Sequence, residues 1–196
     1  GNELGDDALR DQAQKFGFDE SFETPLRAAT SRFPADPDEP QTAMSAIGQF
    51  DVRATAMQMA MVAAAVGNAG VTMRPGLVDQ AAAPDLAPLE TFDPTEFAQA
   101  MSRENATQLA DMMVGVVNEG TGSNAQIPGV EVAGKTGTAQ TAKDRPNIAW
   151  FISFAPATDP QVAVAVAIER SGAAEVGGNT LAAPIARAVM QAVLSG

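Results

Sequence analysis

Three strand-like segments follow one another in the C-terminal half of the chain, over residues 131–140, 148–155 and 162–169, and they restrict the possible folds strongly. The last of them alternates valine and alanine, a composition that suits a strand. The segments between them are short and rich in turn-forming residues, so they leave no room for crossover helices. Because such connections place successive strands side by side in opposite directions, we predict an antiparallel meander.

Helices are predicted before and after these strands from capping residues, hydrophobic periodicity and helix-ending glycines. Asp6 or Asp7 is expected to cap the first helix and Ser102 the third, while Pro184 is tolerable only in the first turn of the last. The second helix is apolar almost all round, which favours a buried position in the middle of the fold. The predicted helices cover residues 6–15, 56–66, 102–117 and, from 179 or 180, the segment up to 194.

Two proline-rich stretches separate these elements. Residues 18–40 are expected to run over the surface without regular structure, and residues 71–94 to form a short strand followed by a loop. The order of helices and strands therefore predicts an α/β protein of the α+β type, in which helices flank an antiparallel sheet.

The composition excludes several kinds of function. The chain has 196 residues, a net charge of −12 and a pI near 4.2, which disfavours binding to nucleic acid or to an anionic membrane surface. It contains no cysteine and no histidine, so thiol nucleophiles, thiolate metal sites and imidazole bases are excluded. A general base must then be a carboxylate or a lysine, and we predict neither a cofactor nor a metal site.

The tetrapeptide Lys135-Thr136-Gly137-Thr138 lies within the first predicted strand. An ammonium, two hydroxyls and a glycine are suited to holding a carboxylate, and they indicate an anionic acyl substrate. In a regular strand Thr136 and Thr138 share one face and Lys135 occupies the other, so all three reach one region only if the strand twists at its end. An exposed edge would allow an extended peptide to add alongside, and the Thr138 N–H to donate to an oxyanion.

Lys-Thr-Gly is one of three motifs that mark penicillin-recognising serine acyltransferases, together with Ser-x-x-Lys and Ser-x-Asn. On this motif and several flanking segments, the chain resembles the C-terminal portion of the transpeptidase domain of a class B penicillin-binding protein, of the PBPA-like type of actinobacteria. The matching segments, in family-like order, are Phe16-Gly-Phe18, Ala46-Ile-Gly-Gln49, Thr55-Ala-Met-Gln-Met-Ala60, residues 134–140, 149–156 and 162–168, and Gly177-Gly-Asn-Thr-Leu-Ala-Ala-Pro184.

The resemblance implies a fold like that of penicillin-binding proteins and serine β-lactamases, incomplete in this chain. Residues 1–196 would be the C-terminal portion of a single transpeptidase domain, and the part with the other two motifs would lie upstream. Lys135 and Thr138 are implied to be catalytic, the lysine by supplying positive charge and Thr138 through its N–H. The implied substrate-binding residues are Thr136, Gly137, Thr138 and Gln140.

The implied activity is peptidoglycan D,D-transpeptidation, in which stem peptides are cross-linked through an acyl-serine intermediate. β-Lactam antibiotics would acylate the same serine. The implied partners are an N-terminal fragment of the same protein that carries this serine, peptidoglycan stem peptides, and cell-division or elongation proteins. The implied location is the extracytoplasmic face of the bacterial plasma membrane, with an anchor in an upstream segment.

Departures from the family pattern leave alternatives open. Ser45, Ser102 and Ser123 fit neither missing motif and are interpreted as helix caps and turn residues. Phe50 stands where many relatives carry a second glycine, which affects the expected shape of that loop. A non-catalytic β-lactam sensor or interaction domain, a β-lactamase and a purely structural module remain possible functions. No carboxylate is placed by a motif to serve as the deacylating base of a β-lactamase.

Overall fold

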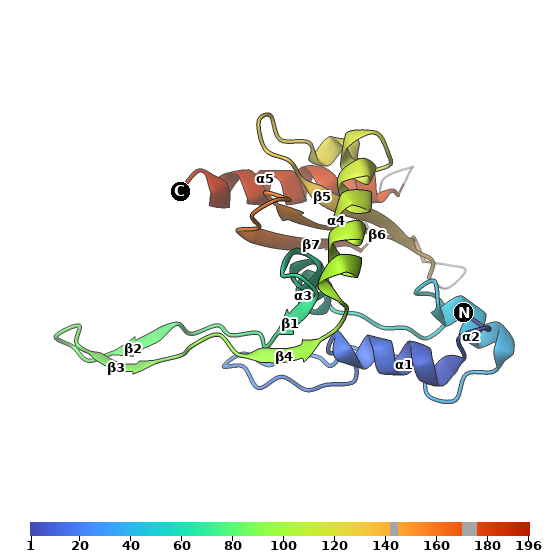
Figure 1. The fold of residues 1–196 in the computed structure, drawn as a ribbon, viewed down its shortest axis with the longest axis horizontal. Coiled ribbons are helices and arrows are strands. Elements are labelled where there is room, and N and C mark those ends of the chain that lie inside the picture. Colours follow the sequence, from blue (N-terminus) through green and yellow to red (C-terminus); the bar gives the residue numbers. More distant parts are fainter. Residues whose placement is uncertain (142–144, 170–175) are drawn as a thin grey trace.

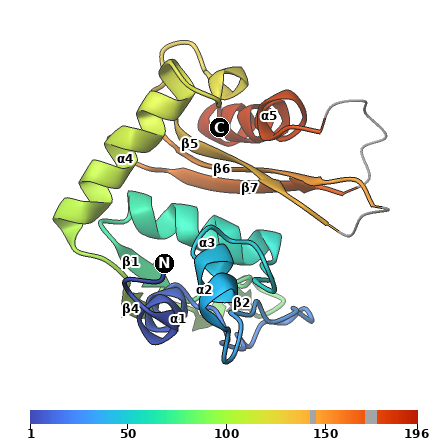
Figure 2. The same ribbon diagram turned by 90° about the vertical axis from the view of Figure 1, so that its right-hand side faces the viewer.

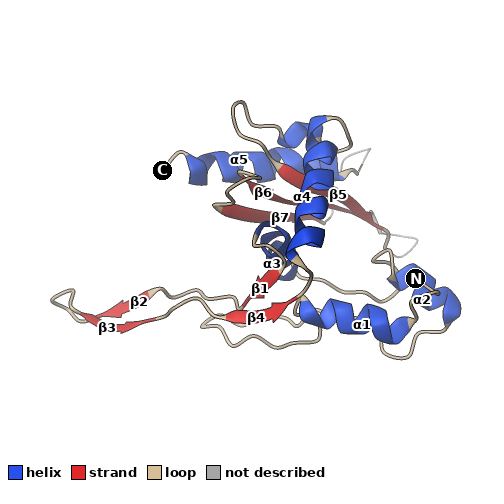
Figure 3. Cartoon of the chain, viewed as in Figure 1, coloured by secondary structure: helices blue, strands red, loops and turns tan. Residues whose placement is uncertain are grey.

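The computed structural model describes residues 1–141, 145–169 and 176–196 and arranges them in two parts (Figure 1). One part contains the C-terminal sheet and its covering helices. The other contains the N-terminal helices and a short two-stranded sheet, from which a long hairpin projects sideways (Figure 3). Lys143 and part of the connection expected over 141–147 lie outside the described residues.

The three predicted strands form one sheet, as β5 (Ala133–Ala139), β6 (Ile148–Ala155) and β7 (Val162–Ile168). Neighbouring strands pair antiparallel in the order β5-β6-β7, and the register runs without a bulge. The predicted meander is therefore confirmed. Among the described strands, β6 is paired on both sides and β5 forms an edge of the sheet.

Helices cover both faces of this sheet (Figure 2). Helix α5 (Ala183–Leu194) lies on one face, and α3 (Ala56–Gly67) lies between the other face and the N-terminal part of the molecule. Helix α4 (Arg103–Asn118) packs against β5 and α3. The central position predicted for the apolar segment 56–66 is thus confirmed. No helix of the described residues is long and apolar enough to cross a membrane.

Each of the two hydrophobic clusters contains one phenylalanine of β6. Phe151 and Phe154 are fully buried and lie an odd number of residues apart, so they point to opposite faces of the sheet. Phe151 belongs to a cluster with Met190 of α5, and Phe154 belongs to a cluster with Val66 of α3 and Met113 of α4. Burying one such side chain contributes about 1.5–3 kcal/mol, so these contacts hold the helices on the sheet.

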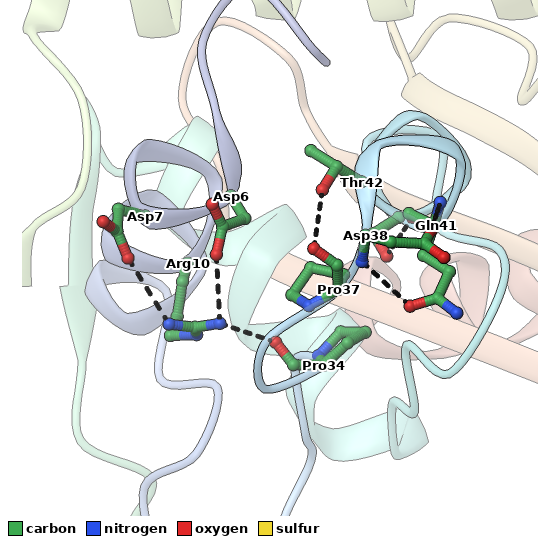
Figure 4. A network of polar contacts seen from close by, with 9 residues as sticks. Asp6, Asp7, Arg10, Pro34, Pro37, Asp38, Gln41 and Thr42 are labelled. Carbon is green, nitrogen blue, oxygen red and sulfur yellow. Dashed lines mark hydrogen bonds and ion pairs between the residues drawn. The ribbon is translucent and has the colours of Figure 1, made fainter.

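The first helix, α1 (Asp6–Lys15), begins without a side-chain cap, so the capping role predicted for Asp6 or Asp7 is wrong. Both carboxylates lie in the first turn, where they interact favourably with the positive end of the helix dipole. They also lie 3.7 and 3.6 Å from the guanidinium of Arg10, which donates to the carbonyl of Pro34 at 3.0 Å (Figure 4). Arg10 therefore ties α1 to the irregular segment that follows it.

A short helix, α2 (Glu39–Ser45), starts at the end of the segment expected to be irregular over 18–40. Asp38 accepts a hydrogen bond from the N–H of Gln41 at 2.9 Å, and the Gln41 side chain accepts one from the N–H of Asp38 at 3.0 Å (Figure 4). This reciprocal capping box starts the helix, and Pro40 stands in the first turn, where a missing N–H costs no helical hydrogen bond. Our prediction did not recognise this start signal.

Replacing Asp38 with alanine is expected to lower the free energy of unfolding by about 1 kcal/mol, because it removes the acceptor of the capping box. Urea unfolding of the full-length protein, followed by circular dichroism, measures the change. Glu20→Ala removes an exposed carboxylate that caps no helix and serves as the control. Equal stabilities of the two variants would contradict the capping role.

Side-chain caps start α3 and α4. Thr55 accepts from the N–H of Gln58 at 3.1 Å at the start of α3, and Ser102 accepts from the N–H of Asn105 at 3.2 Å at the start of α4. Each contact satisfies a backbone donor that has no partner within the helix. The capping role predicted for Ser102 is therefore confirmed.

The stretch 71–94 contains more strand than expected. The predicted strand is β1 (Val71–Met73), which pairs antiparallel with β4 (Glu96–Gln99). The expected loop instead forms a hairpin of β2 (Gln80–Ala82) and β3 (Pro88–Thr91). All of β3 is exposed, so backbone pairing rather than an apolar face holds this hairpin together. The sequence therefore shows no hydrophobic alternation from which the hairpin could be predicted.

The last helix begins later than residue 179 or 180. A π-helical turn, η2 (Gly178–Ala182), precedes α5, and Pro184 stands in the first turn of α5 as expected. A proline lacks the N–H needed for an internal helical hydrogen bond, which explains why the regular helix begins close to it. The π-helical turn places residues 178–182 beside the sheet, where η2 contacts β5 and β6.

Candidate active site

The tetrapeptide Lys135-Thr136-Gly137-Thr138 lies in the middle of β5, at the edge of the described sheet. Its residues pair with β6 in unbroken register, and Thr136 stands opposite Phe151. Cross-strand partners share a face, so Thr136 and Thr138 lie on the face that carries α5, whereas Lys135 lies on the other. The alternation expected from the pleat is present.

The side chain of Lys135 is exposed at this edge. Its Nζ donates to the main-chain oxygen of Thr136 at 2.6 Å, so the ammonium bends back toward the strand. Among the described residues, no serine hydroxyl forms a hydrogen bond with Lys135, and no carboxylate forms an ion pair with it. The positive charge is therefore available to an anionic group that approaches the edge of β5.

The hydroxyl of Thr136 is held by a second threonine. Its Oγ1 lies 2.8 Å from Oγ1 of Thr121, a hydrogen bond in which either oxygen can donate. Thr121 belongs to the turn that follows α4, and Thr136 itself is half-buried. Nothing in the sequence indicates that this turn contacts β5.

Gly178 of η2 packs closely against the same segment of β5. A Cβ atom at this position would overlap the main-chain oxygen of Trp150 and lie 3.1 Å from Cβ of Thr136 and 3.2 Å from the nitrogen of Gly137. Only a glycine allows the π-helical turn to approach the backbone this closely. Gly178 therefore supports β5 from the face that carries Thr136.

Two asparagines join η2 to the short 3-10 turn η1 (Ser123–Ala125). The N–H of Asn124 donates to Oδ1 of Asn179 at 2.9 Å, and Nδ2 of Asn124 donates to the main-chain oxygen of Asn179 at 3.0 Å. Nδ2 of Asn179 lies 3.4 Å from Oγ of Ser123. These contacts link the segment after α4, which carries Thr121, to the segment that carries Gly178.

The other two candidate residues lie further along the same edge. Thr138 is exposed in β5, and Gln140 is exposed just beyond its end. Cavities of about 620 and 370 Å³ among the described residues are not lined by Lys135 or Thr138. These exposed side chains lie along the edge strand β5, with Thr138 on the face that carries α5 and Lys135 on the other.

Comparison with known proteins assigns the family. The model of the penicillin binding protein transpeptidase domain matches residues 1–191. The chain belongs to this family. It is 44% identical, over 202 residues, to the peptidoglycan D,D-transpeptidase PbpA of Mycobacterium tuberculosis, covering 100% of this chain and 41% of that protein. PbpA of Mycolicibacterium smegmatis is 43% identical over 199 residues, covering 99% of this chain and 40% of that protein.

Solved structures of penicillin-binding proteins share the fold. The crystal structure of PBPA from Mycobacterium tuberculosis superposes with a TM-score of 0.90 at 42% identity, covering 99% of this chain and 47% of that one. A penicillin G acyl-enzyme complex of penicillin-binding protein A from M. tuberculosis gives a TM-score of 0.88 at 44% identity, covering 99% and 44%. The predicted fold and the PBPA-like resemblance are confirmed, and the chain spans less than half the length of these relatives.

Proposed function

We propose that the domain to which this chain contributes is a peptidoglycan D,D-transpeptidase. The main support is the position of Lys-Thr-Gly-Thr on the edge strand of a transpeptidase fold, with an exposed ammonium at Lys135. An edge strand offers unpaired main-chain groups to an extended peptide, and hydroxyls and an ammonium complement its terminal carboxylate. A D-Ala-D-Ala stem peptide has both features.

In the proposed reaction, a serine oxygen attacks the carbonyl carbon of the penultimate D-alanine. The peptide C–N bond breaks, the terminal D-alanine leaves with a proton on its amine, and an acyl-serine ester remains. An amine of a neighbouring stem peptide then attacks the ester, the new amide bond forms, and the serine regains its proton. A β-lactam would acylate the same serine.

Residues of β5 would act on this reaction from the edge of the sheet. Lys135 would supply positive charge and help to organise proton transfer, and the N–H of Thr138 would donate to the oxyanion. The hydroxyls of Thr136 and Thr138 would bind the carboxylate, with Gly137 leaving room for the peptide and Gln140 extending the binding edge.

The nucleophile has to come from elsewhere in the domain. Neither Ser-x-x-Lys nor Ser-x-Asn occurs in these 196 residues. We therefore propose that residues 1–196 form the C-terminal portion of one transpeptidase domain, completed by upstream sequence that carries both motifs. We also propose an extracytoplasmic location at the plasma membrane, with the anchor upstream and cell-division or elongation proteins as partners.

Mass spectrometry of the full-length protein after treatment with penicillin G tests the proposal. We expect a covalent adduct on a serine outside residues 1–196, in a Ser-x-x-Lys sequence, and transfer of a stem-peptide thioester to an acceptor amine. An adduct without transfer would instead identify a β-lactam sensor. Rapid penicillin hydrolysis would identify a β-lactamase, and the absence of any adduct would rule out all three functions.

A further inference from the structure

The hydrogen bond between Thr121 and Thr136 joins the turn after α4 to the substrate-binding strand. The two Oγ1 atoms lie 2.8 Å apart, a good distance for hydroxyl groups. Thr121 belongs to none of the three motifs that mark this family. Its only polar contact among the described residues is the one with Thr136.

The turn that carries Thr121 is fixed in place. The N–H of Gly122 donates to the carbonyl of Val116 at 2.9 Å, and Gly122 is buried. A Cβ at Gly122 would lie 3.3 Å from Cε2 of Phe151, the residue that pairs with Thr136 across the sheet. The turn therefore rests on the cross-strand neighbour of Thr136, and this packing sets the distance between the two hydroxyls.

Thr136 is also restricted by Gly178. A Cβ at Gly178 would lie only 3.1 Å from Cβ of Thr136, so η2 is in close contact with this side chain. A threonine side chain has few allowed rotamers, and crowding reduces them further. The direction of the Thr136 hydroxyl is thus set by Gly178 through packing and by Thr121 through a hydrogen bond.

The proton of each hydroxyl can serve only one acceptor. A threonine hydroxyl has one proton and two lone pairs. When Thr136 donates its only hydroxyl proton to a carboxylate, its oxygen can still accept a hydrogen bond but the group cannot donate a second one. The neighbouring hydroxyl of Thr121 must then be the donor. Thr121 then donates to Thr136, and the two hydrogen bonds polarise each other in one direction, from Thr121 through Thr136 to the anion.

We propose that Thr121 is a positioning residue that donates to Thr136 and so directs the Thr136 proton toward the substrate carboxylate. The inference rests on the proposed function, which gives Thr136 this carboxylate as its ligand. It predicts that Thr121 strengthens recognition of substrates that carry the carboxylate and does little for neutral analogues.

The test compares acylation of the full-length protein by penicillin G and by its methyl ester, which lacks the negative charge. Thr121→Val is expected to slow acylation by penicillin G about 5-fold, the effect of one lost hydrogen bond, while the rate with the ester changes less than about 2-fold. Thr121→Ser restores the hydroxyl and is expected to restore the rate. Thr107→Val, at an exposed site on α4, is the matched control.

Equal slowing with both compounds, or no rescue by serine, would show that Thr121 has only a structural role. Thr121→Ala gives the same comparison without placing a second methyl group in the turn, and circular dichroism checks folding. Thr136→Val distinguishes a failure of the positioning role of Thr121 from a failure of the carboxylate-binding role of Thr136. If Thr136→Val changes the ratio of the two rates and Thr121→Val does not, the inference about Thr121 alone is wrong. If neither changes it, the carboxylate role of Thr136 is wrong as well.

Discussion

Replacing Lys135 with alanine is expected to slow acylation of the full-length protein by a fluorescent penicillin about 100-fold or more. The substitution removes an ammonium that lies exposed on β5 and has no carboxylate partner among the described residues. A charged group that binds the transition state more strongly than the ground state lowers the barrier to acylation. Its loss therefore slows acylation far more than it destabilises the fold. Gel densitometry over a time course measures the second-order rate constant.

The fold is expected to tolerate this change. The Lys135 side chain is exposed, so its loss removes little buried area, and the midpoint of thermal unfolding should remain nearly unchanged. Lys15→Ala removes another exposed ammonium, from α1, and is the matched control. Thr138→Val on the same strand is expected to slow acylation less strongly. Wild-type acylation rates for both β5 variants would overturn the site assignment.

Replacing Gly178 with alanine is expected to lower the free energy of unfolding by about 1–3 kcal/mol and to slow acylation roughly 10- to 100-fold. The added methyl group would overlap the main-chain oxygen of Trp150 and press on Thr136 and the nitrogen of Gly137. Because backbone atoms cannot rotate away, η2 or β5 has to move. A displacement of β5 shifts the groups proposed to hold the substrate.

Gly115 provides the control for this prediction. It lies on an exposed part of α4, and a Cβ there would meet no atom within 4 Å. Gly115→Ala is therefore expected to stabilise the helix by about 0.5–1 kcal/mol and to leave acylation unchanged. Urea unfolding and penicillin labelling of both variants give the comparison. If Gly178→Ala behaves like Gly115→Ala, the close packing of η2 on β5 does not matter for the site.

The strands of the C-terminal sheet were predictable because their signals are local. Valine and alanine alternate in β7, and turn residues separate it from β6. The cap at Ser102 is equally local, since the hydroxyl and the N–H that it accepts from are three residues apart. The hairpin of β2 and β3 was missed because β3 has no buried face to impose a pattern.

The starts of α1 and α2 show that residue type alone does not identify a helix cap. Asp6 and Asp7 have the residue type of a cap, yet the cap position is a glycine and the carboxylates lie near Arg10 instead. At Asp38 the capping box follows directly on prolines that normally interrupt helices. In both places the contacts that form are short-range, but several local structures are compatible with the same residues, so residue type alone does not choose between them.

Residues 133–139 contain enough information by themselves to specify a strand with a lysine and two threonines on opposite faces, since the pleat follows from backbone geometry. The motif and its flanking segments also identified the family. Only the tertiary structure decided that Thr121 and Gly178 meet Thr136, because these contacts join residues from the turn after α4, from η2 and from β5 that no short-range pattern relates. Packing around Phe151 brings those segments together, and packing depends on the whole core.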